Sequence, residues 1–177
     1  MAMTLITTNT LSNATNSSFT SGIDSTYKLY IFKFLDIGPA TDNSDFSFNG
    51  SIDGGSNYNV TKTATGGHSY HVEDNSAAAL TYEGGWDLAQ STAYFNLCND
   101  VGGGADESAA GTLWLFNPSN TTYVKHFYTM NNYYSQSNQS TNSFFGGYFN
   151  NADNIDAVDF KMSSGNFDGV IKMYGVG

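Results

Sequence analysis

The chain has 177 residues, a formal net charge of −10 and six basic residues, all of them lysines. Without arginine there is no bidentate group for phosphates or base edges, and the negative charge repels polyanions, so we predict no nucleic-acid partner. No apolar run approaches the ~20 residues that a membrane-spanning helix needs, and the first ten residues lack the basic and apolar parts of a secretory signal, so we expect neither a membrane partner nor classical export.

The single cysteine, Cys98, excludes an intrachain disulfide and has the neighbours of a half-buried strand thiol. Aromatic residues (15%) outnumber charged residues (12%), a balance that favours strands.

The first 22 residues are rich in Ser, Thr and Asn and precede the first charged residue, Asp24. Such a stretch cannot bury enough apolar area to order itself, so it is either a loose arm or a first strand that pairs with a sheet. We favour pairing and expect this arm to contribute to assembly through its apolar side chains, Leu5, Ile6, Leu11 and Phe19. Residues 23–177 are predicted to form a single β-sandwich domain.

Alternating apolar and polar residues, separated by turn signals, indicate about eight to ten short strands. Residues 29–35 carry apolar side chains in both registers, which predicts a central strand covered on both faces. Residues 56–65 suit a strand with one wet face that ends at Gly66 and Gly67. Only residues 76–80 suggest a short helix. The pattern therefore predicts an all-β sandwich or barrel with at most one short helix.

The last 23 residues, IDAVDFKMSSGNFDGVIKMYGVG, carry the clearest local signal. Residues 155–162 alternate, residues 163–168 suit a turn, and the alternation then resumes through Tyr174. The stretch predicts a β-hairpin, and we expect five of its apolar side chains to be buried in the core: Val158, Phe160, Met162, Ile171 and Met173.

The sequence offers no catalytic constellation. His68 and His71 are three residues apart, and on a strand such positions point to opposite faces, which disfavours a metal site. The three glutamates fall in turns or glycine-rich loops, whereas sandwich-fold glycosidases present paired acids on a sheet: Glu73, Glu83 and Glu107. The aspartates lie mostly in turns, where they bond their own backbone. We predict that the protein is not an enzyme and that it uses no metal and no cofactor.

Three aromatic residues lie in polar or glycine-rich segments that we expect to be exposed: Trp86, Tyr133 and Tyr134. Exposed rings flanked by Asn and Gln suit sugars, which present an apolar face and a fringe of hydroxyls. The alternative, which we favour, is that these rings cover core edges or a subunit interface.

Three segments carry a family resemblance: FTSGIDSTYKLYIFKFLDIGPATDNSDFSF, GTLWLFNPSNTTYVKHFYTM and GGYFNNADNIDAVDFKMSSGNFDGVIKMYGV. Together they resemble a family of tailed-bacteriophage virion structural proteins, decoration-like or tail-fibre-like, especially from phages of marine bacteria, and the resemblance spans residues 4–176. Residues 66–111 are the least characteristic part. These motifs mark strands and turns and identify no catalytic residue. The resemblance implies a jelly-roll-like antiparallel β-sandwich.

The function that this resemblance implies is assembly into a particle, most simply as a capsid decoration or knob protein. The alternative is a tail-fibre tip or adhesin domain that binds carbohydrate on the host surface. The expected partners are other virion proteins, either the major capsid protein or tail components, together with further copies of the chain in a homo-oligomer, for which we favour a trimer. The expected location is the virion, after synthesis in the cytoplasm of a host bacterium.

Overall fold

The computed structural model describes residues 2–177, and within them it contains thirteen strands and a single turn of 3-10 helix. The elements are β1 (Met3–Ala14), β2 (Ser17–Phe19), β3 (Leu29–Pro39), β4 (Ser44–Ser51), β5 (Lys62–Val72), β6 (Ala78–Tyr82), η1 (Gly84–Trp86), β7 (Leu88–Ser91), β8 (Phe95–Val101), β9 (Ala109–Phe116), β10 (Lys125–Ser135), β11 (Gln139–Phe149), β12 (Ala157–Met162) and β13 (Phe167–Val176). The predicted all-β antiparallel sandwich with at most one short helix is confirmed. The sequence pattern undercounted the strands because β2, β6 and β7 are too short to show a period.

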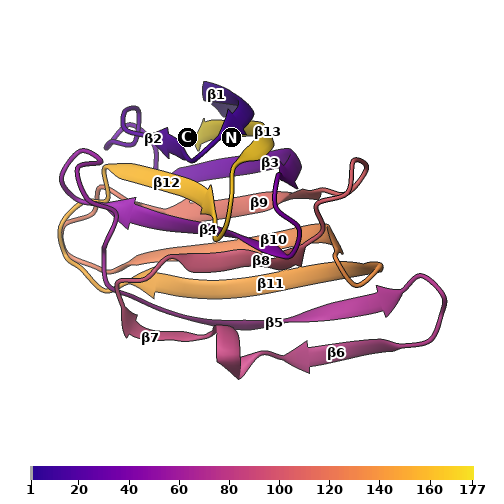
Figure 1. Cartoon of the computed structure of the whole chain (residues 1–177). Helices are drawn as coiled ribbons and strands as arrows, with labels where there is room; N and C mark the ends of the chain where they lie inside the picture. The colour runs from indigo at the N-terminus through magenta and orange to yellow at the C-terminus, as the bar shows by residue number, and fades with distance from the viewer. Residues whose placement is uncertain (1) are drawn as a thin grey trace.

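The strands form two layers of unequal size (Figure 1). The large layer has the order β1-β13-β3-β9-β10-β11-β5, and β6 and β7 share the outer edge of β5. The small layer has the order β2-β12-β4-β8. One residue pair, Val101 of β8 with Ser135 of β10, joins the two layers. Every pairing among the described strands is antiparallel, and the architecture is a two-layered sandwich whose layers share this single pair.

Phenylalanine rings fill the space between the layers. Phe160 of β12 lies at the centre of this cluster, in contact with Phe34 and Phe32 of β3 at ring-centroid distances of 5.2 and 5.3 Å. Phe48 of β4 meets Phe127 of β10 at 5.0 Å. Aromatic pairs at these separations add about 0.5–1.5 kcal/mol beyond the area that they bury. The five side chains for which we predicted burial are all in this core, each at most 4% exposed.

The N-terminal residues are strands of the molecule's own two layers. β1 pairs with β13 along most of its length, and β2 pairs with β12. Phe19 is buried between layers, while Ile6 and Leu11 are partly buried against the core. Leu5 differs from these three because its side chain is 51% exposed.

The predicted C-terminal hairpin is wrong. β12 and β13 follow each other in the chain, but they lie in different layers: β12 pairs with β2 and β4, and β13 pairs with β1 and β3. The connection at residues 163–166 crosses between the layers instead of turning within one. Alternation shows that each of the two segments has one apolar face. The apolar face of β12 and that of β13 are both buried because the two strands face each other across the same core.

Three further local predictions differ from the structure. Residues 76–80 form the end of a turn and part of β6, not a helix, because β6 pairs with β5 from Gly67↔Tyr82 to His71↔Ala78. β3 is central within its sheet, yet its outer face is open, since Lys33 and Leu35 are exposed.

Gly66 and Gly67 lie inside β5 instead of ending it. A Cβ on Gly66 would clash with the Phe144 carbonyl oxygen, and one on Gly67 would clash with the Thr81 carbonyl oxygen. The glycines therefore allow a close approach of neighbouring strands, which is the other common use of glycine within a strand.

Candidate functional site

The three aromatic residues expected at the surface do not form one site. Tyr133 and Tyr134 are neighbours on β10 and therefore point to opposite faces: Tyr133 is only 2% exposed, so the prediction that it lies at the surface is wrong. Tyr134 is half-buried and its hydroxyl donates to Glu73 Oε2 at 3.1 Å. Trp86 is half-buried and stacks on His68 at a ring-centroid distance of 4.9 Å. Strand alternation alone could have separated the two tyrosines.

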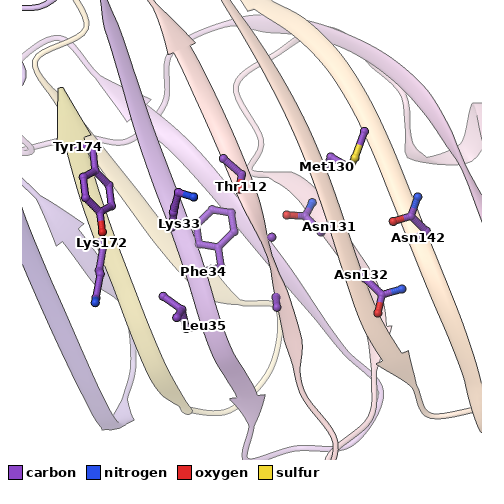
Figure 2. A pocket seen from close by; sticks show the side chains of 12 residues that line it. Lys33, Phe34, Leu35, Thr112, Met130, Asn131, Asn132, Asn142, Lys172 and Tyr174 are labelled. Atoms are coloured by element: carbon purple, nitrogen blue, oxygen red, sulfur yellow. The ribbon is translucent and has the colours of Figure 1, made fainter. Parts of the chain in front are cut away.

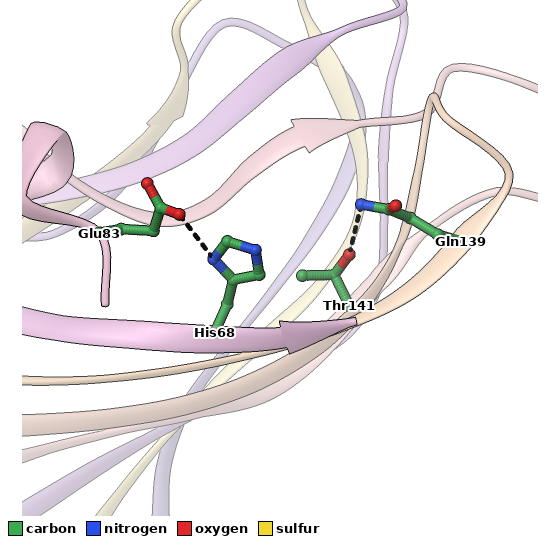
Figure 3. Close-up of polar contacts among 4 residues, drawn as sticks. All are labelled: His68, Glu83, Gln139 and Thr141. Atoms are coloured by element: carbon green, nitrogen blue, oxygen red, sulfur yellow. Dashed lines mark hydrogen bonds and ion pairs between the residues drawn. The ribbon is translucent and has the colours of Figure 1, made fainter. Parts of the chain in front are cut away.

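The histidines do not converge on a metal. His68 is 8% exposed and its Nδ1 lies 3.8 Å from Glu83 Oε1 (Figure 3). His71, in contrast, is exposed. Further along the same region Gln139 Nε2 donates to Thr141 Oγ1 at 3.3 Å, so these polar side chains pair locally. Within residues 2–177 no three His, Cys, Asp or Glu residues lie together as metal ligands. Complete burial raises the pKa of the Cys98 thiol, which makes thiolate chemistry there unfavourable.

Several aspartates stabilise turns. Asp24 Oδ1 accepts a hydrogen bond from the Thr26 backbone nitrogen, and Asp74 Oδ1 accepts one from that of Ser76, both at 2.8 Å. Hydrogen bonding by the side chains of Thr26 and Ser76, and then by their backbone nitrogens, lowers the pKa of each carboxyl. Asp53 is the extreme case, because hydrogen bonds from Asn57 and then Ser51 lower its pKa to about 2. Each of these acids is a local acceptor in a turn.

The outer face of the large layer is distinctive in its charge. The three strands β9, β10 and β11 contain no acidic residue, and β3 and β13 contain one each, Asp36 and Asp168, near the end of the strand. This is unusual in a chain with sixteen acidic residues. Exposed apolar side chains occur at separate points across the same face, from β1 at one edge to β6 at the other: Leu5, Leu35, Leu80, Tyr82, Phe116, Tyr128 and Met130.

A groove of about 510 Å³ crosses the centre of this face (Figure 2). Its floor is the small side chains of β9 around Ala110 and Thr112, and it is flanked by the longer Leu35 of β3 and Met130 of β10. Small residues between two rows of long ones leave a depression on an otherwise flat sheet. The volume is within the usual range of ligand sites.

Two lysines lie side by side at one end of the groove. Lys33 of β3 and Lys172 of β13 are direct cross-strand partners, and both line the groove together with Tyr174. None of the described residues that line it is acidic. Like charges placed directly opposite on neighbouring strands destabilise a sheet, so this arrangement costs stability and suits a negatively charged partner.

Amides lie across the groove from these lysines. Asn132 of β10 and Asn142 of β11 are cross-strand neighbours on the same face. Asn132 Nδ2 donates to Ser140 Oγ and to the Thr141 carbonyl oxygen, both at 3.1 Å, which holds this amide in place. Sequence reasoning missed the lysines and the amides because they come from four strands whose register it could not supply.

The free edge of β1 is the second feature that could serve recognition. β1 is twelve residues long, pairs with β13 on one side only, and contains neither a charged residue nor proline. Thr4 and Leu5 are both exposed, so neither face of the strand is covered at this end. Long, uncharged edges of this kind are templates for pairing with another strand, and most proteins block them with charges or proline. Two register shifts, at Leu5/Thr7 and Leu11/Ala14, are the irregularities in its pairing with β13.

Comparison with known proteins gives no match. No protein-family model, no curated protein and no solved structure is significantly similar to this chain. Among residues 2–177 there is also no helix long and apolar enough to cross a membrane. The geometry described above is therefore the basis for a functional proposal.

Proposed function

We propose that the protein is a structural subunit of a tailed-bacteriophage virion, a capsid decoration or knob protein that acts by assembly and not by catalysis. The virion assignment draws on the sequence resemblance. The assembly mode is carried by one structural observation, the long uncharged edge of β1. In this proposal the partners are further copies of the chain and the capsid or tail proteins on which they sit.

Strand addition explains how so plain a sequence can bind. An edge strand recognises its partner mainly through backbone hydrogen bonds, so side-chain chemistry is needed only to leave the edge open. The N-terminal half of β1 meets this need. Its Leu5 side chain, which does not contribute to the core, would be covered by the added strand. Pairing of β1 with a different sheet edge of the next copy, repeated around a three-fold axis, produces a closed trimer, which is the state that we favour.

The edge can be blocked without disturbing the fold. Thr4→Lys together with Leu5→Lys places two charges on exposed positions of β1. The matched control, Thr121→Lys with Thr122→Lys, adds the same charge to an exposed loop. Mass measurement by light scattering across a concentration series should show an oligomer for the unmodified chain and the control, and a monomer for the edge variant.

Hydrogen exchange supplies an independent readout of the same contact. The amides of residues 3–8 should gain protection as the unmodified protein associates, and this gain should be absent in the edge variant. A chain that stays monomeric at every concentration, or an edge variant that associates normally, would contradict assembly through β1. The virion assignment has its own test, because capsid, portal or tail genes should lie beside the gene for this chain.

A further inference from the structure

The groove on the outer face of the large layer has a chemistry that assembly through β1 does not use. We propose that it binds a carboxylated sugar residue of an acidic glycan, with the carboxylate between Lys33 and Lys172. This site is distinct from the β1 edge and does not depend on the assembly role.

The lysine pair is the strongest part of the argument. Of the six lysines, Lys62 and Lys125 are fully buried, and Lys161 lies over the ring of Tyr94 at 4.1 Å. Lys33 and Lys172 form no ion pair with any described residue. They are nevertheless paired with each other in register. An anion between them would replace a repulsion with two favourable contacts.

The rest of the groove is suited to a sugar ring. Tyr174 and Met130 provide apolar surface, and sugars present an apolar face to such side chains. Asn132 and Asn142 provide amides on the opposite side from the lysines. The Asn132 oxygen can accept a hydrogen bond from a sugar hydroxyl, and the Asn142 amide can both donate and accept. Apolar lining with a few oriented polar groups is the usual composition of a small-ligand site.

Other anions fit this groove less well. The chain has no arginine to grip the phosphates of a nucleic acid or polyphosphate in two places. An acidic peptide would satisfy the lysines but leave the paired amides and the ring of Tyr174 without a matching partner. A glycan with one carboxylate per sugar unit would contact the lysine pair, the apolar surface and the amides of the groove.

The test uses the full chain and trigalacturonic acid as the probe, measured by calorimetry at low salt. Binding should be seen with the acid and not with its methyl ester, which keeps the rings and hydroxyls but lacks the charge. Lys33→Gln and Lys172→Gln should each weaken binding, and the double variant should weaken it at least tenfold. Lys28→Gln, which removes an equal charge from an exposed loop, should leave the affinity unchanged.

Chemical-shift mapping should place the perturbed amides on β3, β9, β10 and β13. Each alternative outcome overturns the proposal. These outcomes are no binding of the acid at millimolar concentration, equal binding of the ester, equal affinity in the double variant, and preferential binding of a hexaglutamate peptide. Because the Lys33 and Lys172 variants leave β1 intact, a failure here would not affect the oligomerisation experiment, and the reverse also holds.

Discussion

Phe160 of β12 and Phe34 of β3 meet edge to face between the two layers, with ring centroids 5.2 Å apart and planes at 69°. Phe160 also contacts Phe46 and Phe48 of the adjacent strand β4, at 5.9 and 6.3 Å. One ring thus ties the small layer to the large one. It is fully buried, so its loss would leave a cavity that the surrounding rings can close only in part.

We predict that Phe160→Ala lowers the free energy of unfolding by about 3–5 kcal/mol, a large part of the 5–15 kcal/mol typical of a domain. Chemical denaturation of the purified variant would measure this loss. Phe116→Ala is the matched control, because Phe116 is 42% exposed on the outer face and should change stability by less than ~1 kcal/mol. Equal, small effects of the two substitutions would contradict the central place given to Phe160.

Sequence reasoning found this ring and its burial but not its partners. The alternation of residues 155–162 and 168–174 shows which side chains are buried, but it does not show which strand pairs with each segment. A hairpin within one layer and a crossover between two layers both bury the same residues, so the pattern could not distinguish them. The same limit hid the groove, because Lys33 and Lys172 become neighbours only through the β3–β13 pairing.

Lys62 illustrates a different limit. In the sequence Lys62 shares one alternating face with Tyr58 and Val60, and its side chain is fully buried, with its Nζ donating to the Ala93 carbonyl oxygen at 2.5 Å. The lysine stem can follow an apolar path while its amine finds one buried acceptor, and no local pattern signals this. Burial lowers the pKa of this amine to about 7.

Lys62 should make stability depend on pH. Its pKa is near 10.4 in an unfolded chain, so between about pH 7 and 10 the unfolded state binds more protons than the folded state, and stability rises with pH. The largest slope is about 1.4 kcal/mol per pH unit. We predict that raising the pH from 7.5 to 9.5 stabilises the unmodified protein by about 2 kcal/mol relative to Lys62→Met, in which this titration is absent.

Urea unfolding of both proteins at the two pH values measures this difference directly. Lys125, whose pKa burial also lowers, is present in both proteins and cancels. The window stops below pH 10 because burial raises the pKa of Tyr133 and Tyr94, which would reverse the slope at higher pH. Parallel pH dependences in the two proteins would show that Lys62 is not the group responsible.

The carboxylate of Asp159 anchors β2 to the small layer. Its Oδ1 accepts hydrogen bonds from Asn16 Nδ2 at 2.8 Å and Ser18 Oγ at 2.6 Å, and its Oδ2 accepts one from the Tyr94 hydroxyl at 2.9 Å. The residue is 2% exposed. Its removal would leave three donors without their acceptor, and each such loss costs about 1–3 kcal/mol where the donor is buried.

We predict that Asp159→Ala destabilises the protein by about 2–4 kcal/mol and that Tyr94→Phe, which removes one of the three bonds, costs about 1 kcal/mol. The loss of stability should be greatest around β2. Hydrogen exchange at residues 17–19 should accelerate in Asp159→Ala more than exchange at β9, which is distant from the carboxylate. Uniform acceleration across both regions would contradict a specific anchor for β2.

Replacing one of the paired lysines of the outer face should stabilise the protein, whereas most substitutions destabilise a protein. Lys33 and Lys172 are cross-strand partners with no acid among the described residues of the groove, so each destabilises the other when no ligand is bound. We predict that Lys172→Gln raises the free energy of unfolding by about 0.2–1 kcal/mol at low salt, and that Lys172→Glu, which converts the repulsion into an attraction, raises it further. Thermal unfolding at low and at high salt checks this, because screening over a Debye length of ~3 Å at 1 M salt should remove the gain. Lys28→Gln, which alters an exposed loop, should have no such effect.

A sheet that keeps two lysines in register at a cost to its own stability is consistent with an anion bound between them. A Lys172→Gln variant that is less stable than the unmodified chain at low salt would contradict the repulsion between the lysines and, with it, the argument for an anion in the groove.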